Sequence, residues 1–245
     1  MITLPRLDPA RIAFPPLESA LDEPNGLLAF GGDLGSERLL AAYSHGIFPW
    51  YSQGQPILWW SPDPRMVIET AAPHVPRRLG RWLKFCPWTI TADRAFTKVI
   101  RHCAEPRGDG AGTWITAEMI DAYRRLHAQG HAHSVEVMDG EELVGGIYGV
   151  AIGRMFFGES MFSARDHASK VALLALCRGL ARAGCPLLDA QVCSDHLQTL
   201  GAIEMPRGEF SRRIAELVDR PPPQQGEWAG LFDGIAPSSL GRPPG

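Results

Sequence analysis

The chain has 245 residues, of which 45% are hydrophobic and 21% are charged, and its formal net charge at pH 7 is −3. This composition is typical of a folded globular protein and allows one large domain or two modest ones. The slight acidity excludes a generic nucleic-acid coat protein, so any contact with nucleic acid must come from a local basic patch.

No apolar run approaches the roughly 20 residues that cross a bilayer, so we expect no membrane association. The first twenty residues lack the basic and apolar regions of a signal peptide. The five cysteines form no C-x-x-C pair and no zinc spacing. An odd number of cysteines without a disulfide framework favours a reducing compartment, and we therefore predict a cytoplasmic protein.

Residues 1–65 are rich in Pro, Gly and aromatic side chains. One helix is predicted from Ser36 to His45, with an apolar stripe on one face and Gly46 as its stop. The run "ILWW" reads as a strand, and the Pro-rich turn "SPDP" that follows marks a domain boundary. We therefore predict a small N-terminal α/β domain over residues 1–65.

The pattern becomes more regular after this turn. Two helices, an antiparallel meander, a further helix and a final strand predict an α+β domain over residues 66–220. The expected strands are 65–70, 88–93, three within 133–162, and 186–192, and the expected helices are 94–105, 116–130 and 163–184. The last segment, 221–245, is rich in Pro, Gly and Gln, and we expect it to be loosely ordered.

A carboxylate interrupts the apolar strand "PLLDAQV". Strand alternation places Asp189 and Gln191 on one face and Leu188 on the other. An unpaired buried carboxylate is costly, so Asp189 requires a cation, several donors or a solvated cleft, and nothing within the run supplies one.

A second carboxylate, Glu159, lies in the aromatic strand "MFFGESMF". Either the two acids find internal Arg or Lys partners, or they line a cleft walled by Phe156, Met161 and Leu188. Such a cleft suits a ligand with a cationic end and an apolar neighbour.

Four basic residues lie within eight positions in "RRLGRWLK", namely Arg77, Arg78, Arg81 and Lys84. On a helix most of them share one face, which suits a phosphate backbone, although a solvated surface carries equal weight. The aromatic run "GIFPWYSQGQPILWW" is more often core than a base-stacking platform. His131 and His133 begin a strand without an acidic or Cys partner at ligand spacing, so we predict no metal site.

Taken in order, the motifs "PNGLLAFGGDL", "HGIFPWYS", "ILWWSPDPR", "GTWIT", "GHAHSVEV", "LVGGIYGV", "GESMF", "ASKVALLAL" and "DAQV…DHLQTLGA" resemble the bacterial leucyl/phenylalanyl-tRNA–protein transferase family. The resemblance covers the chain from about residue 14 to residue 214. It implies transfer of Leu or Phe, and less well Met, from aminoacyl-tRNA to proteins with an N-terminal Arg or Lys, which creates a degradation signal. It also implies a second domain similar to the Gcn5-related N-acetyltransferase fold.

The resemblance assigns roles to the anomalous residues. Asp189, Gln191 and Glu159 would lie at the reacting centre, and the missing cation would be the acceptor's own Arg or Lys side chain. The aminoacyl side chain would enter a pocket lined by Ile147, Phe156, Gly158, Met161, Leu176, Leu180 and Leu188. Tyr43, Trp50, Trp114 and Tyr123 match family aromatics near the terminal adenosine of the tRNA and the acceptor. Arg77, Arg78, Arg81 and Lys84 would bind the tRNA.

An ester donor and an amine acceptor require no ATP, metal or other cofactor, so catalysis would be mostly positioning. We expect Asp189 to orient either the acceptor cation or the Gln191 amide. One rival is an acyl-CoA-dependent N-acyltransferase, but the connection "MFSARDHASK" lacks the glycines of a pyrophosphate-binding loop. The other rival is a non-enzymatic reader of basic N-termini, which would leave the apolar pocket unexplained.

Overall fold

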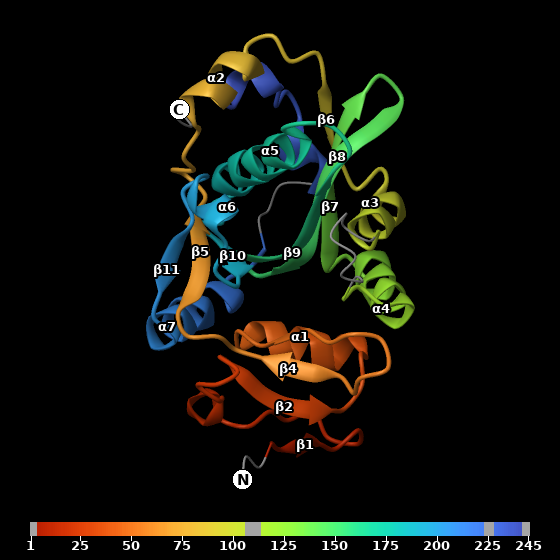
Figure 1. Cartoon of the computed structure of the whole chain (residues 1–245), viewed down its shortest axis with the longest axis vertical. Coiled ribbons are helices and arrows are strands. Elements are labelled where there is room, and N and C mark those ends of the chain that lie inside the picture. The colour runs from red at the N-terminus through yellow and green to blue at the C-terminus, as the bar shows by residue number, and fades with distance from the viewer. Residues whose placement is uncertain (1–3, 106–113, 223–227, 242–245) are drawn as a thin grey trace.

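The computed structural model describes residues 4–105, 114–222 and 228–241, and within these the chain forms two sheets (Figure 1). The smaller sheet has the order β1-β2-β4-β3, in which only β1 and β2 are parallel. Its strands are β1 (Arg6–Leu7), β2 (Leu27–Gly31), β3 (Phe48–Pro49) and β4 (Leu58–Trp60). The N-terminal part of the chain therefore builds a sheet of its own.

The larger sheet has the order β11-β5-β10-β9-β8-β7-β6, and β9 and β10 are its only parallel neighbours among the described strands. Its strands are β5 (Arg65–Glu69), β6 (Thr89–Ala92), β7 (Ala132–Asp139), β8 (Glu142–Ile152), β9 (Met155–Ser163), β10 (Leu187–Gln191) and β11 (Ile203–Met205). Because β10 lies between β5 and β9, both of its edges are paired, as its short apolar sequence requires.

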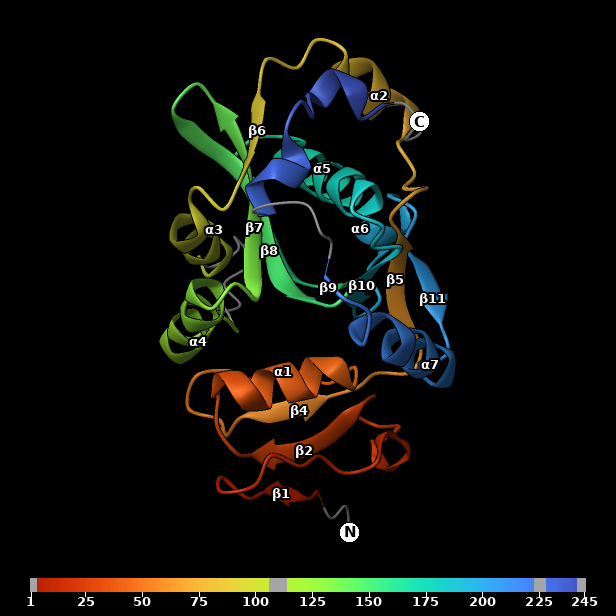
Figure 2. The same cartoon turned by 180° about the vertical axis from the view of Figure 1, so that it is seen from behind.

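Helices cover both faces of the larger sheet. They are α1 (Ser36–Ser44), α2 (Arg77–Leu83), α3 (Phe96–Cys103), α4 (Ala117–Ala128), α5 (Ala168–Arg182), α6 (Asp195–Gln198) and α7 (Arg207–Val218). The helices α3 and α4 pack on one face and α5 crosses the other, while α1 lies between the two sheets (Figures 1 and 2). This arrangement places the C-terminal end of α1 beside the larger sheet.

The buried apolar side chains form two clusters, one on each face of the larger sheet. The first contains Trp59 of β4 together with Tyr123 of α4 and Phe157 of β9. The second contains most of α5 with parts of α2 and of the C-terminal segment. Because residues of both sheets share the first cluster, the small sheet packs directly against the rest of the molecule.

The predicted α+β class is confirmed, and local signals explain two helix ends. The Thr116 hydroxyl caps α4 by accepting a hydrogen bond from the Met119 amide at 3.3 Å. After α1, Gly46 has a φ of +74°, and a Cβ there would lie 2.9 Å from the Phe210 ring. Only glycine fits this left-handed turn, so α1 ends where the sequence predicts.

The helix predicted over residues 163–184 begins later, at Ala168. The strand β9 continues through Ser163, and His167 has a φ of +74°, which is incompatible with a helical turn. The sequence does not predict the helix α7 or the strand β2. The helix α7 is amphipathic and packs against α1, and the strand β2 is short and pairs with β4. The structure of each segment therefore depends on its partner.

The expectation of a loosely ordered tail over 221–245 is wrong for residues 228–241, and residues 223–227 and 242–245 lie outside the described part of the chain. Leu231, Phe232, Ile235 and Leu240 are buried in the second apolar cluster. The spacing of these apolar side chains is irregular, so no periodic pattern in the sequence marks the segment. In addition, among the residues that the structure describes, no helix is long and apolar enough to span a bilayer.

Candidate active site

A cavity of about 360 Å³ opens where β9, β10 and the N-terminal part of α5 meet the aromatic segment after α1. Its lining is mostly apolar, and its acidic members are Glu159 and Asp189. The lining residues are Phe48, Pro49, Trp50, Ile68, Trp114, Ile147, Gly158, Glu159, Ser160, Met161, Leu173, Leu188, Asp189, Ala190, Gln191, Val192, Ser194, His196 and Leu197. A concave apolar site with a few converging polar groups is typical of a substrate pocket.

The structure identifies the partner of Asp189, and it is internal. Arg65 of β5 donates two hydrogen bonds to this carboxylate, from Nε to Oδ1 at 2.8 Å and from Nη2 to Oδ2 at 2.7 Å. Neither residue is exposed to solvent. The expectation that the acceptor's own cation pairs with Asp189 is therefore wrong, because a bidentate arginine already neutralises the carboxylate.

Strand alternation does not hold at the end of β10. The pairing register with β5 shifts between Asp189 and Gln191, and Gln191 has a φ of +63°. The backbone N–H of Gln191 donates a hydrogen bond to Asp189 Oδ1 at 2.9 Å, which stabilises this turn. A left-handed conformation at a residue other than glycine is costly and is found most often at functional sites. The turn brings residues from both faces of the predicted strand to the cavity wall.

Glu159 of β9 is the centre of a buried hydrogen-bond network. The Gln191 Nε2 donates to its Oε1 at 2.6 Å, and the hydroxyls of Tyr43 and Tyr123 lie 2.7 Å and 2.8 Å from Oε1 and Oε2. Burial disfavours the charged form and raises the pKa of the Glu159 carboxyl to about 7, although the three donors oppose this shift. Glu159 therefore exchanges its proton near neutral pH.

The number of protons in this network depends on the charge of Glu159. The hydroxyls of Tyr43 and Tyr123 also contact each other. When Glu159 is ionised and both hydroxyls donate to it, neither has a proton left for that contact. When Glu159 is protonated, a closed ring of three hydrogen bonds can form from the carboxyl through both hydroxyls and back. The site can thus store a proton beside the cavity.

The residues predicted to line the donor pocket divide into two groups. Ile147, Gly158, Met161 and Leu188 line the cavity, whereas Phe156, Leu176 and Leu180 are buried in the core and are not among the lining residues. On α5 the position that reaches the cavity is Leu173, which lies closer to the N-terminus of the helix. A helix that crosses the sheet obliquely presents only one turn to the site, and the sequence does not define which turn.

The predicted aromatic residues also divide. Trp50 and Trp114 line the cavity, and Trp50 is 39% exposed, whereas Tyr43 and Tyr123 are fully buried behind Glu159. The sequence patterns do not single out Arg65, which lies at the end of the "SPDPR" turn that marks the domain boundary. The sequence feature that could have indicated Arg65 is a charged residue beside the apolar run Met66–Ile68, just as Asp189 is a charged residue within an apolar strand.

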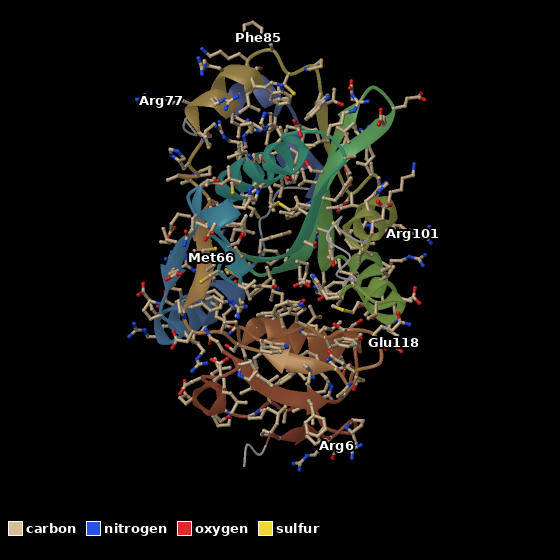
Figure 3. The ribbon with its side chains drawn as sticks, viewed as in Figure 1. Arg6, Met66, Arg77, Phe85, Arg101 and Glu118 are labelled. Atoms are coloured by element: carbon tan, nitrogen blue, oxygen red, sulfur yellow. The ribbon has the colours of Figure 1, made fainter. Side chains whose placement is uncertain are left out.

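The basic cluster Arg77, Arg78, Arg81 and Lys84 lies on α2 and just after it, and all four residues are exposed. Next to them Phe85 is 86% exposed. Figure 3 shows Arg77 and Phe85 at the end of the molecule opposite Arg6, away from Met66 of β5. The structure does not bring the basic cluster into the cavity, so any nucleic acid would have to span the distance between them.

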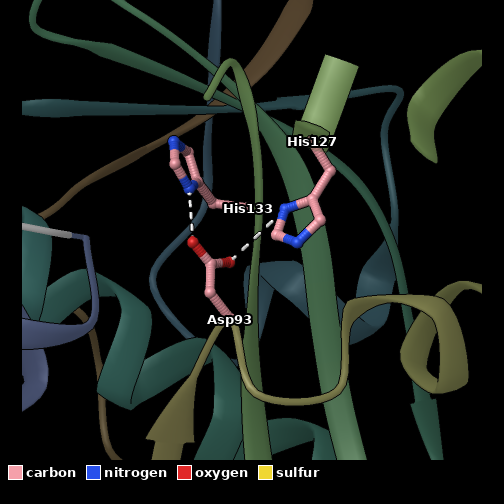
Figure 4. A group of neighbouring side chains, drawn as sticks. All are labelled: Asp93, His127 and His133. Atoms are coloured by element: carbon pink, nitrogen blue, oxygen red, sulfur yellow. Dashed lines mark hydrogen bonds and ion pairs between the residues drawn. The ribbon is translucent and has the colours of Figure 1, made fainter. Parts of the chain in front are cut away.

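His133 has an acidic partner that its sequence neighbourhood does not reveal. Its Nδ1 lies 2.7 Å from Asp93 Oδ2, and His127 Nδ1 lies 3.9 Å from Asp93 Oδ1 (Figure 4). His127 Nδ1 is also 2.8 Å from the Ala132 carbonyl oxygen, and the ring of His133 stacks on Trp228 at 4.3 Å. The ligand atoms of Asp93, His127 and His133 lie within 4.8 Å of one another, a spacing that could hold a metal ion, so the expectation that His133 has no acidic partner is wrong.

Comparisons with known proteins give a consistent result. The family described as "Leucyl/phenylalanyl-tRNA protein transferase" matches residues 67–215, and the family described as its N-terminal domain matches residues 32–63. Three similar proteins bear the name leucyl/phenylalanyl-tRNA–protein transferase. The one from Xanthomonas axonopodis pv. citri (strain 306) is 58% identical over 94% of this chain and 92% of its own length. The one from Xanthomonas campestris pv. campestris (strain B100) is 57% identical over 94% of this chain and 93% of its own length. The one from Cellvibrio japonicus (strain Ueda107) is 51% identical over 89% of this chain and 93% of its own length.

Proposed function

Since the chain belongs to the leucyl/phenylalanyl-tRNA protein transferase family and moves an aminoacyl group from tRNA to a protein, we propose that its acceptor is the α-amine of a protein that begins with Arg or Lys. The product would carry a new N-terminal Leu or Phe and would be a degradation signal in the cytoplasm. The observation that carries the proposal is the hydrogen-bonded pair of Glu159 and Gln191 on the wall of a mostly apolar cavity.

The reaction needs an amine and an ester held together. The amine nitrogen attacks the ester carbonyl carbon, the bond from that carbon to the ribose oxygen breaks, and a peptide bond forms. One proton leaves the nitrogen and one is gained by the ribose oxygen, so the step is balanced without ATP. Positioning two groups at roughly 3–3.5 Å supplies most of the acceleration for such a reaction.

Gln191 and Glu159 are the groups we assign to the amine. The Nε2 of Gln191 already donates to Glu159, so its Oε1 is the atom that accepts a hydrogen bond from the substrate amine. The acceptor amine has a reference pKa of about 8, close to the pKa of about 7 of Glu159. Ionised Glu159 is therefore matched to take up a proton from the ammonium form. Of the two roles considered for Asp189, the hydrogen bond that it accepts from the Gln191 backbone N–H supports a role in orienting Gln191.

We assign the aminoacyl side chain to the apolar part of the cavity. Ile147, Met161 and Leu188 line it, together with Leu173. Trp50 and Trp114 lie at the same cavity and offer flat faces to the terminal adenosine or to the acceptor's cationic side chain. Phe156, Leu176 and Leu180 support these walls from the core and are not proposed to touch the substrate.

We further propose that the exposed α2 cluster binds the tRNA backbone. Arg77, Arg78, Arg81 and Lys84 provide four positive charges on a protein that is acidic overall. Phosphate contacts position a nucleic acid without reading its sequence, which suits an enzyme that accepts more than one tRNA.

Two finer structural assignments accompany this proposal. The antiparallel strands β6 to β9, the helix α5 and the parallel strand β10 follow the order expected of a Gcn5-related N-acetyltransferase-like domain. The change from the smaller to the larger sheet falls between Trp60 of β4 and Arg65 of β5, which supports a domain boundary close to the predicted division into 1–65 and 66–220. Both assignments are proposals that rest on strand order.

One assay tests the function. The purified protein is incubated with radiolabelled leucyl-tRNA and peptides that begin with Arg, Lys or Ala, and with an N-acetylated Arg peptide. Radiolabel should enter only the peptides that begin with a free Arg or Lys. Equal labelling of the Ala peptide would show that the acceptor class is wrong, and labelling of the N-acetylated peptide would show that the α-amine is not the acceptor. A parallel arm with labelled acetyl-CoA tests the acyl-CoA rival, which requires transfer from that donor.

A further inference from the structure

Arg65 contacts both segments that build the polar end of the cavity. Besides its two bonds to Asp189, its Nη1 donates to the carbonyl oxygen of Gly46 at 2.9 Å. Gly46 follows the C-terminal end of α1, and its amide donates to the carbonyl of Tyr43 at 2.9 Å. One guanidinium thus joins β10 to the end of the helix that carries Tyr43.

The two joined segments meet again at a single atom. Gln191, held through Asp189, donates to Glu159 Oε1 at 2.6 Å, and the Tyr43 hydroxyl lies 2.7 Å from the same oxygen. The distance between Gln191 and Tyr43 therefore depends on how Arg65 spaces β10 from the end of α1.

The guanidinium also packs against two aromatic rings. Its central carbon lies 4.7 Å from the centre of the Phe48 ring and 4.8 Å from that of Phe210. Phe48 also lines the cavity. A guanidinium that contacts two rings and forms a bidentate bond has little freedom to tilt, and a lysine ammonium could reproduce neither set of contacts.

We propose that Arg65 is a positioning residue for aminoacyl transfer. It sets the placement of Gln191 and Tyr43 around Glu159, and it neutralises the Asp189 carboxylate, so that this charge is not available to a substrate. It touches no substrate. The proposal rests on the proposed function, because the amine that Gln191 would orient is the acceptor's. It follows that the acceptor's cationic side chain is recognised by groups other than Asp189.

The central test compares Arg65→Lys with Arg38→Lys. Arg38 is also buried and also makes several hydrogen bonds, to Asp33 and to backbone carbonyls near the N-terminus, but it does not line the cavity. We expect R65K to lower kcat at least about tenfold while Kd for leucyl-tRNA stays within about twofold, since small misplacements are costly to the chemical step. R38K should lower stability without changing kcat of the folded protein.

A double-mutant cycle shows whether Arg65 acts through Gln191. In a Gln191→Ala background R65K should reduce kcat by a clearly smaller factor, because Gln191, the group through which Arg65 would act on the amine, is gone. An unchanged loss in that background would overturn the proposal, and so would an R65K protein with kcat within about twofold of the wild type.

Two further measurements separate this proposal from folding and from the choice of acceptor. If R65K does not fold, the Arg65→Met/Asp189→Leu protein replaces the pair with apolar side chains and should fold but show the same loss of kcat. Hydrogen exchange of backbone amides needs no substrate, and the backbone N–H of Gln191 should exchange faster in R65K than in the wild type; equal exchange contradicts the proposal.

If the wild type labels only an acceptor other than the Arg or Lys peptides, the proposed function fails. The ratios of kcat between variants and wild type are then measured on that acceptor.

Discussion

Arg65 and Asp189 form a buried ion pair in which each charge compensates the other. Asp189→Ala leaves the Arg65 cation buried without its carboxylate, so we expect the free energy of unfolding to fall by about 3–5 kcal/mol and transfer to be lost. Urea denaturation measures the first effect. The Arg65→Met/Asp189→Leu protein is the control and should be near wild-type stability, because it removes both charges. A stable Asp189→Ala protein would show that the pair contributes little.

The Glu159 carboxyl should make stability depend on pH. Its pKa rises from an ordinary 4.5 to about 7 on folding, so between these values the folded protein binds more protons than the unfolded chain. The free energy of unfolding therefore falls as pH rises through this window, by about 3 kcal/mol if the whole shift is realised. Its contribution is fully present below pH 4.5.

Glu159→Gln isolates this effect because the variant cannot ionise at this position. Denaturation of both proteins at about pH 5 and about pH 8 should show the wild type losing stability relative to the variant as pH rises. A difference that stays constant between the two pH values would mean that Glu159 ionises in the folded state as readily as in the unfolded chain.

Tyr148 provides a contrasting hydroxyl. It is fully buried, and no atom of the described residues hydrogen-bonds to its oxygen. Removing an unsatisfied buried hydroxyl is neutral or stabilising, so Tyr148→Phe should leave the free energy of unfolding unchanged or raise it by up to about 1 kcal/mol. Tyr43→Phe is the matched variant, since it removes a bonded hydroxyl and should be destabilising. A similar loss in both would show that Tyr148 has a partner such as water.

At the scale of elements, α2 is the segment whose charge we connect with tRNA. Replacing Arg77, Arg78, Arg81 and Lys84 by Gln should weaken binding of any tRNA. The slope of the logarithm of the binding constant against the logarithm of the salt concentration should become shallower by roughly 0.7–0.9 for each phosphate that is no longer neutralised. Binding titrations at several salt concentrations measure both quantities. Arg6→Gln, at the opposite end of the molecule (Figure 3), is the control. Unchanged affinity and salt slope would identify the cluster as a solvated surface.

The elements also show where sequence patterns are sufficient. The helices α1 and α4 and the strands β5 and β10 are predictable because each has its own apolar periodicity and end signals. The helix α7 is not, although Phe210 and Ile214 are buried. Its amphipathic pattern is clear only once α1 and Arg65 are known to cover that face.

For the whole molecule, the donor specificity depends on a cavity built from several elements. The proposed pocket should accept Leu and Phe, and less well Met, and should reject Ile and Val, which carry a second heavy atom on Cβ. Binding alone discriminates by about 1–3 kcal/mol per methylene, so rejection must come from a misplaced ester.

Transfer from leucyl- and isoleucyl-tRNA to an Arg peptide compares the two side chains directly. Met161→Ala should lower transfer of Leu and Phe while tRNA binding is unchanged, because no residue of α2 lines the cavity. Equal transfer of Leu and Ile would show that the aminoacyl side chain is not bound in this cavity.

The amino-acid order alone is enough to predict the α+β class, most helices and strands, the family resemblance, and the two carboxylates that interrupt apolar strands. Each of these depends on near neighbours along the chain or on motif order. Which side chains meet is a different matter. Arg65 and Asp189 are 124 residues apart and Tyr43 and Glu159 are 116 apart, so their contacts exist only once β5 lies beside β10 and α1 packs against the larger sheet. Only the folded arrangement shows that Asp189 is neutralised within the protein and that Gln191 is hydrogen-bonded to Glu159 at the cavity wall, because burial and pairing depend on packing between distant segments.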